Sequence, residues 1–157
     1  MERHRAGQPG RPADRYSLTM AENCFGCGDD NPQGLHIQYV DEADATISTT
    51  LSLSWLHSGE PGIVHGGIQA TILDEVLGRV AQRTVTEAAG ERRTVVTASF
   101  QLRYRSPCLT GSEITARARL HRIEWPSVFV EGEITDSDGL LLTEATARWR
   151  VIDDDQI

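Results

Sequence analysis

One carboxylate, Asp74, stands among small residues in the longest helical pattern of the chain. Gly67, Ala70, Gly78 and Ala81 lie on the same helical stripe, at spacings of three and four residues. Small side chains would let a slim ligand approach a carboxylate that is otherwise costly to bury. Asp74 is therefore a candidate nucleophile or general base. The alternative is an ordinary helix-face carboxylate whose small neighbours only let the helix pack tightly.

A second candidate feature, the turn His65-Gly66-Gly67, stands where this helix is predicted to begin. The first N–H groups of a helix lack partners within it and lie at the positive end of its dipole, where they can stabilise an oxyanion. Two residues without a Cβ would let a substrate carbonyl approach the main chain. The alternative for the glycines is a plain tight turn. For His65 we favour a turn histidine that hydrogen-bonds backbone over a catalytic role.

The elements that must position these groups can be read from the apolar periodicity. No proline interrupts the chain from Gly66 to about Thr86, which predicts one central helix. The apolar residues on its predicted core face are Leu73, Val76, Leu77 and Val80.

All other regular patterns alternate with the period of a β-strand. The predicted strands cover residues 35–39, 47–53, 96–105, 112–123, 127–135 and 140–151. In the third of these, Val96, Ala98 and Phe100 would face one side, and Thr97 and Ser99 the other. Two strands, one helix and four more strands predict an α+β domain, an antiparallel sheet of about six strands around one long central helix. Long edge strands invite pairing, which predicts a homo-oligomer with continuous sheets.

The 157 residues suit one domain of ordinary size. We expect a disordered leader over residues 1–22, the folded domain over 23–152 and an acidic tail over 153–157. The sequence has neither an apolar stretch long enough to span a membrane nor the pattern of a secretory signal, so we expect a cytoplasmic protein without a membrane partner. The net charge of −8 argues against nucleic acid, since affinity for phosphate backbones comes from Lys and Arg.

Three cysteines leave one unpaired, and a cytoplasmic setting would keep all of them reduced. Cys24 and Cys27 form a CxxC pair, but a tetrahedral zinc site needs four ligands, and only His36 and Cys108 are conceivable companions. An ordinary loop over residues 23–34 is the favoured interpretation, ahead of zinc or a redox pair.

Residues 56–78, LHSGEPGIVHGGIQATILDEVLG, resemble the active-site signature of the PaaI-like acyl-CoA thioesterases of the hotdog superfamily, in which an HGG turn precedes a helical Asp or Glu. The interval from His65 to Asp74 matches that pattern. CFGCGDDNPQGL resembles the cysteine-containing openings of many such proteins, and VVTASFQLRYRSP resembles their strand after the helix. The resemblance covers most of residues 23–150 and implies a hotdog fold.

The resemblance also implies roles for single residues. Asp74 would be the nucleophile or the base that activates water, the Gly66 N–H would polarise the thioester carbonyl with Gly67 beside it, and Thr97 would position the carboxylate or the water. His57 and Ser58 compete for holding the water, with a slight preference for His57. In the family such a site is built across a dimer interface, which agrees with the predicted homo-oligomer, a dimer or a dimer of dimers.

Coenzyme A would need cations for its phosphates, and Arg103 and Arg105 on the polar side of one strand are candidates, followed by Arg117 and Arg119 on the next. A solvated strand face is the alternative for each of them. No metal or redox cofactor is required for the hydrolysis. Two other functions remain possible from the sequence: an acyl-CoA-binding module without turnover, and an enoyl thioester hydratase.

Overall fold

The computed structural model describes residues 22–152. The chain divides into two compact units, Met1–His36 and Ile37–Ile157, of which residues 22–36 and 37–152 are described. The predicted leader, apart from its last residue, and the predicted acidic tail lie outside the described residues.

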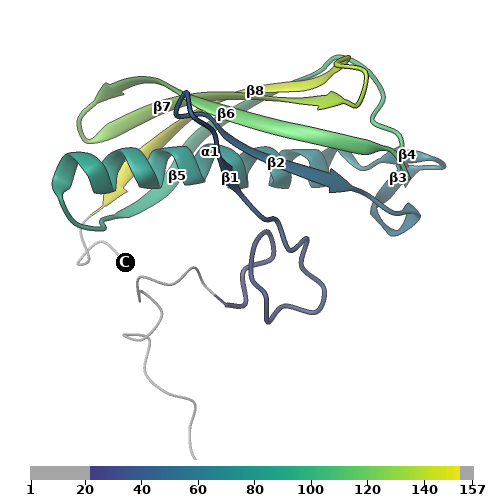
Figure 1. The fold of residues 1–157 in the computed structure, drawn as a ribbon, viewed down its shortest axis with the longest axis horizontal. Coiled ribbons are helices and arrows are strands. Elements are labelled where there is room, and N and C mark those ends of the chain that lie inside the picture. Colours follow the sequence, from purple (N-terminus) through teal and green to yellow (C-terminus); the bar gives the residue numbers. More distant parts are fainter. Residues whose placement is uncertain (1–21, 153–157) are drawn as a thin grey trace, which may run out of the picture. The chain divides into compact units, whose positions relative to one another are not determined.

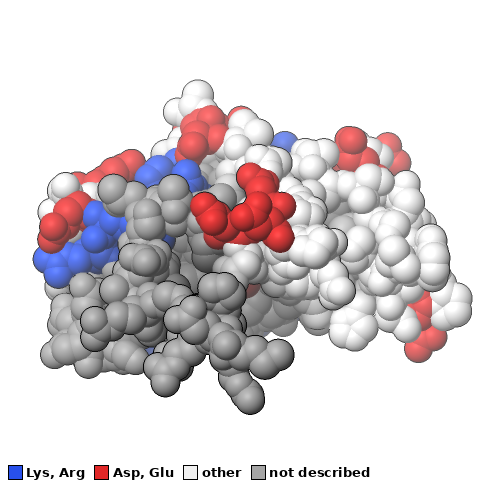
Figure 2. All heavy atoms as spheres, turned by 90° about the horizontal axis from the view of Figure 1, so that it is seen from below, with Lys and Arg blue, Asp and Glu red and all other residues white. Residues whose placement is uncertain are grey.

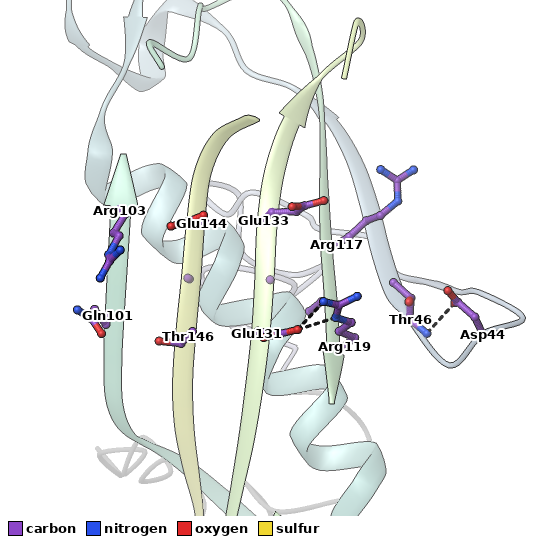
Figure 3. Close-up of a pocket in the computed structure, with 13 residues that line it drawn as sticks. Asp44, Thr46, Gln101, Arg103, Arg117, Arg119, Glu131, Glu133, Glu144 and Thr146 are labelled. Carbon is purple, nitrogen blue, oxygen red and sulfur yellow. Dashed lines mark hydrogen bonds and ion pairs between the residues drawn. The ribbon is translucent and has the colours of Figure 1, made fainter. Parts of the chain in front are cut away.

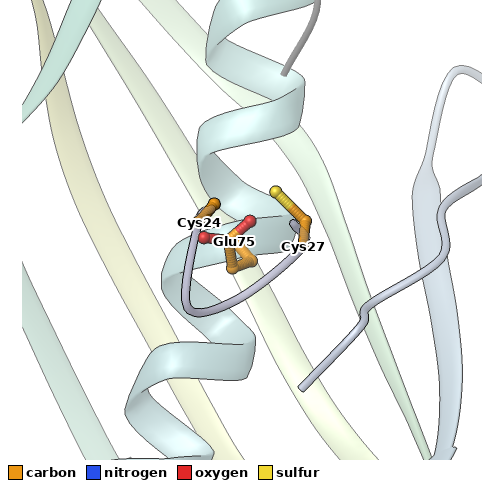
Figure 4. Close-up of side chains that lie close together, drawn as sticks. All are labelled: Cys24, Cys27 and Glu75. Carbon is orange, nitrogen blue, oxygen red and sulfur yellow. The ribbon is translucent and has the colours of Figure 1, made fainter. Parts of the chain in front are cut away.

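Residues 22–36 of the first unit form successive turns, as predicted from the sequence. The Gly28 N–H donates to the Cys24 carbonyl at 3.0 Å, and the Leu35 N–H donates to the Phe25 carbonyl at 2.8 Å. Cys24 and Cys27 stand on one such turn and form no disulfide (Figure 4). Within residues 22–36, His36 does not join the two sulfurs as a metal ligand. Residues 22–36 are therefore a loop without regular secondary structure.

The second unit contains one long helix along one face of a six-stranded antiparallel sheet (Figure 1). The strands stand in the order β1 (Val40–Asp41), β2 (Ile47–Ser52), β6 (Glu113–Glu124), β7 (Ser127–Asp136), β8 (Leu141–Ile152) and β5 (Thr94–Tyr104). The helix is α1 (Gly66–Ala89). A short 3-10 helix η2 (Trp55–His57) and the small hairpin β3 (Ser58–Glu60) and β4 (Ile63–Val64) precede it. The α+β prediction is confirmed.

The core lies between α1 and the inner face of the sheet. The four helix residues predicted to face the core, Leu73, Val76, Leu77 and Val80, have no exposed surface. Ala116 and Ala118 of β6 and Val128 and Val130 of β7 are buried on the sheet side. Burial of these apolar side chains on both layers is what holds α1 against the strands.

Part of the stripe of small residues beside Asp74 serves this packing. A Cβ added at Gly78 would lie 2.6 Å from Cη2 of Trp149, so the Trp149 ring occupies the space that a larger residue would need. At this end of the stripe, the group that comes close to the helix is a side chain of β8. The small residue at position 78 is therefore explained by packing against the sheet.

Two sequence predictions about local structure were wrong before the helix. The strand expected over residues 35–39 does not form, because His36 has a φ of 51° and breaks the extended chain; only Val40–Asp41 pairs with β2. The hairpin of β3 and β4 was missed, since its strands of three and two residues are too short for a visible alternation.

A third prediction, the uninterrupted alternation along residues 96–105, was also wrong. The pairing register between β5 and β8 shifts between Thr97 and Ser99, where Ala98 is an extra residue. Thr97 pairs with the inward-facing Trp149, whereas Ser99 pairs with the outward-facing Arg148. A one-residue insertion reverses the faces, so Thr97 faces the helix and Ser99 does not.

No helix within residues 22–152 combines the length and the apolar character needed to cross a membrane. On the face shown in Figure 2, most of the Arg side chains seen among the described residues gather at one end, while Asp and Glu occupy several separate places.

Candidate functional site

The Asp74 carboxylate is held by a residue from the edge strand of the sheet. The hydroxyl of Thr97 donates a hydrogen bond to Asp74 Oδ1 at 2.9 Å. Asp74 is half-buried on α1, and Thr97 is exposed because β5 has no neighbouring strand on its outer side. The pair is therefore reachable from the open edge of the sheet.

The environment of Asp74 makes it a better base than an ordinary exposed carboxylate. Burial raises the pKa of Asp74 above its usual value of 3.8, because desolvation disfavours the charged form. The hydrogen bond from Thr97 acts in the opposite direction, and the negative charge of Glu75 adds to the increase. A raised pKa brings a carboxylate closer to the range in which general bases work.

The turn before α1 has an almost complete set of backbone hydrogen bonds. The Val64 N–H donates to the Cys108 carbonyl and the His65 N–H to the His57 carbonyl, each at 2.8 Å. The His65 carbonyl accepts the first bonds of the helix, from Ile68 at 3.0 Å and Gln69 at 3.3 Å. These bonds fix the peptide unit between His65 and Gly66.

His65 adopts the structural contact that was favoured for it. Its side chain caps the helix: Nδ1 accepts a hydrogen bond from the Gly67 N–H at 2.8 Å. This bond requires an unprotonated Nδ1 and uses one of the four N–H groups that a helix start leaves without partners. The Gly66 N–H, by contrast, has no acceptor among residues 22–152. It is therefore a backbone donor without a partner at the helix start.

His57 and Ser58, the candidates for holding water, lie in the segment that is bonded to this turn. The His57 ring nitrogen Nδ1 is 3.3 Å from the Ser54 hydroxyl, and Ser58 pairs with Val64 in the small hairpin. Within the described residues neither side chain hydrogen-bonds Asp74. The two candidates are therefore near the helix start rather than beside the carboxylate of the same chain.

The two arginines considered for coenzyme A lie on the opposite side of the sheet from Asp74. Arg103 pairs with Glu144 across β5 and β8, and Arg105 forms an ion pair with Glu144 at 2.5 Å. Arg103 lines a groove of about 630 Å³ on the outer sheet face, together with Arg117 and Arg119 (Figure 3). Neither Asp74 nor Gly66 lines that groove. Within one chain, the structure does not bring these cations and the carboxylate together.

Two polar groups near the turn were missed from the sequence. Gln69 is 4% exposed, donates from Nε2 to the Val64 carbonyl at 3.3 Å and accepts from the Thr143 hydroxyl of β8 at 2.5 Å. Its position on the same face as Leu73 was a signal, because a polar residue on an apolar helix face needs a partner. Tyr104 donates from its hydroxyl to the Gly66 carbonyl at 2.9 Å. No pattern in the sequence singled out that hydroxyl.

Within residues 37–152 the structure contains no group of three side chains placed to hold a metal ion. The chemistry available to this unit is that of a carboxylate with a raised pKa, a positioning hydroxyl and a free N–H at a helix start. These are the groups used in acyl transfer.

Comparisons with known proteins agree with this chemistry. The sequence model of the Thioesterase superfamily matches residues 61–143, slightly more than half of the chain. Acyl-coenzyme A thioesterase THEM4 of Mus musculus is 33% identical over 125 residues, which cover 77% of this chain and 51% of that protein. THEM4 of Rattus norvegicus is 33% identical over 129 residues, covering 79% of this chain and 52% of that protein. The chain spans about half the length of these curated relatives.

Solved structures share the fold. Protein RHA08564, a thioesterase superfamily protein, is 26% identical, with a TM-score of 0.67 over 78% of this chain and 60% of that chain. The PaaI protein of E. coli, at 13% identity, has a TM-score of 0.65 over 76% of this chain and 81% of its own. The likeness confirms the expected hotdog fold, and together with the match over residues 61–143 it establishes that the chain belongs to the thioesterase superfamily.

Proposed function

We propose that the protein hydrolyses an acyl-CoA thioester to a free carboxylic acid and coenzyme A. The observation that carries the proposal is the pairing of a carboxylate held by Thr97, Asp74, with a free N–H at the start of the same helix, Gly66. Two further observations support it. The curated relatives are named acyl-coenzyme A thioesterases, and a Bacillus halodurans protein of the same fold was crystallised with CoA, at 23% identity and a TM-score of 0.67.

The geometry of one chain argues that two chains complete the site. Gly66 and Asp74 are eight residues apart on α1, which separates them by about 12 Å along the helix axis. Reacting atoms must approach to about 3–3.5 Å. A carbonyl held at Gly66 is thus out of reach of Asp74 in the same chain. We infer that the Asp74 carboxylate acts on a carbonyl held by the partner's Gly66.

The edge strand β5 is the element that can bring the two chains together. Thr97 on β5 contacts Asp74, and Tyr104 at its end contacts Gly66, so β5 runs antiparallel to α1. If two copies of β5 pair antiparallel with their centre at Gln101 and with the extra residue Ala98 left unpaired, Thr97 of one chain stands opposite the partner's Tyr104. Asp74 then faces the helix start of the partner. This pairing would also satisfy the exposed N–H and C=O groups of the edge.

The reaction follows from these positions. The thioester carbonyl oxygen accepts a hydrogen bond from the Gly66 N–H at the helix start, where the dipole favours developing negative charge. Asp74 takes a proton from water, whose oxygen adds to the carbonyl carbon and forms a tetrahedral oxyanion. The C–S bond then breaks, the carboxylic acid forms, and the thiolate of coenzyme A leaves and is protonated. Direct attack by Asp74 on the carbonyl carbon, followed by hydrolysis of the anhydride, is the other route that this arrangement allows.

The remaining residues expected from the sequence have supporting places in this proposal. His65 caps the turn and Gly67 leaves room beside the carbonyl, while His57 and Ser58 stand near the helix start, where they could hold water for the partner's Asp74. Arg103 and Arg105 precede and follow Tyr104 in the chain and lie on the outer face of the sheet. To contact them, the phosphates of coenzyme A would have to extend around the edge of the sheet. The cytoplasmic location and the choice between dimer and tetramer stay predictions.

A panel of short-chain, aromatic and long-chain acyl-CoAs tests the proposed activity through the release of free thiol. We expect release from at least one class without added metal. Tight binding of acyl-CoA without thiol release from any class would instead support the non-catalytic binding module. Addition of water to an enoyl-CoA, seen as loss of the enoyl absorbance with no thiol release, would support the hydratase.

A further inference from the structure

We infer that Tyr104 is a positioning residue for the Gly66 oxyanion donor. The inference rests on the proposed hydrolysis and goes beyond it, because it assigns a function to a hydroxyl that the reaction itself does not require. Tyr104 donates to the Gly66 carbonyl at 2.9 Å from the last residue of β5. The bond joins the edge strand to the first residue of α1.

The contact between the ring and the turn is close. A Cβ added at Gly66 would lie 3.1 Å from the Tyr104 hydroxyl oxygen, 3.2 Å from Cζ and 3.4 Å from Cε1. Tyr104 therefore packs on the Gly66 Cα itself. Any larger residue at position 66 would push the tyrosine ring away. The contact therefore requires glycine at this position.

Without such a contact the turn would be poorly defined. Glycine loses more conformational freedom on ordering than any other residue, and two glycines begin this helix. The peptide before Gly66 is fixed because the His65 carbonyl accepts from Ile68 and Gln69. The peptide after Gly66 is fixed at its carbonyl by Tyr104 and at its N–H by His65. With both flanking peptides held, the φ and ψ of Gly66 are set and its free N–H keeps one direction.

A fixed donor direction affects the transition state more than the bound substrate. An oxyanion gains most from donors that are already oriented before the charge develops, because no reorganisation is then needed during the reaction. Loss of the tether should lower kcat, whereas KM should change little. A residue that only bound the substrate would change KM instead.

The test uses Tyr104→Phe in the full chain, with Tyr39→Phe as the matched control. Tyr39 also donates a phenol hydrogen bond to a residue of α1, the carboxylate of Glu75. We expect Tyr104→Phe to lower kcat about 3- to 10-fold with KM within about twofold, the range that the loss of one hydrogen bond predicts. Tyr39→Phe should leave kcat within about twofold. An unchanged kcat, or an increase in KM alone, in Tyr104→Phe would overturn the positioning role.

A second measurement separates this inference from the proposed activity. Amide NMR of the Gly66 and Gly67 N–H groups requires no substrate, and Tyr104→Phe should shift both signals and speed their hydrogen exchange relative to wild type and Tyr39→Phe. Glycine signals that stay unchanged would overturn the tether even if thiol release is normal. If the wild-type protein releases no thiol but the glycine signals move as expected, the proposed hydrolysis fails and the tether stands.

Discussion

The Thr97 hydroxyl donates to Asp74 Oδ1 at 2.9 Å across the edge of the sheet. The contact exists because the β-bulge at Ala98 turns Thr97 toward α1, while the rest of the polar side of β5 faces away. It both orients the carboxylate and lowers its pKa against the effect of burial. We therefore expect the orientation and the pKa of the Asp74 carboxylate to change when this hydrogen bond is removed.

Replacing Thr97 by valine keeps the shape of the side chain and removes the donor. We expect Thr97→Val to lower kcat/KM about 10-fold and to raise the pKa of Asp74, since its hydrogen bond favours the carboxylate form. Thr97→Ser should restore most of the activity. Thr115→Val, which removes an exposed hydroxyl contact with Thr50 on β2, is the control and should behave as wild type. Equal activity of Thr97→Val and wild type would exclude a role for this hydroxyl.

The pH dependence of kcat/KM should report the raised pKa of Asp74. A base must be deprotonated to act, so activity should fall on the acid side with an apparent pKa above the ordinary 3.8. Because the charge of Glu75 contributes to the increase, Glu75→Gln should keep the activity and move the acid limb to lower pH. A limb that does not move, or that moves to higher pH, would show that the titrating group is not Asp74.

The close packing of Gly78 against Trp149 predicts a stability effect. Gly78→Ala places a Cβ within 2.6 Å of the indole ring and should cost about 1–3 kcal/mol of the free energy of unfolding. The Trp149 Nε1 atom is buried without a hydrogen-bond partner in the described residues, so Trp149→Phe removes bulk and no hydrogen bond. In chemical denaturation, the double variant should lose less stability than the sum of the single variants. Strictly additive losses would mean that the two residues do not compete for the same space.

The proposed pairing of two β5 strands can be tested by disulfide cross-linking. A single cysteine at Gln101, at the centre of the pairing, should cross-link two chains under mild oxidation. Arg103→Cys, exposed on the same strand and the same face, should not, because each further residue adds about 3.3 Å on both chains and exceeds the reach of a disulfide. Cross-linking at Arg103 alone, or the mass of a single chain in solution for the wild type, would contradict the proposed site between two chains.

The sequence predicted the fold well because long elements carry strong periodic signals. The helix over Gly66–Ala89 and the four long strands after it each repeat their apolar pattern several times. Short or irregular features were not predicted. A single residue with a left-handed backbone conformation, His36, ended one predicted strand, and a single extra residue, Ala98, reversed the faces of another. An irregularity at a single residue does not change the apolar periodicity of the sequence, so the pattern does not reveal it.

The site was predictable only in part for the same reason. Asp74, Gly66 and Thr97 could be named from their spacing and from family resemblance, and the structure joins Thr97 to Asp74. The roles of Tyr104 and Gln69 depend on contacts between elements far apart in sequence. A residue's own position in a strand or helix does not encode such contacts.

The most direct test of the account is thiol release by Asp74→Asn beside the wild type. With the best acyl-CoA of the panel we expect loss of nearly all activity, about 100-fold or more, because an amide can neither attack a carbonyl nor accept the proton of water. The melting temperature at pH 7 should be equal or higher: the folded pKa lies above the unfolded one, so ionisation of Asp74 costs stability as pH rises past 3.8. Activity near the wild-type level in a folded Asp74→Asn protein would contradict the assignment of Asp74 to the chemistry.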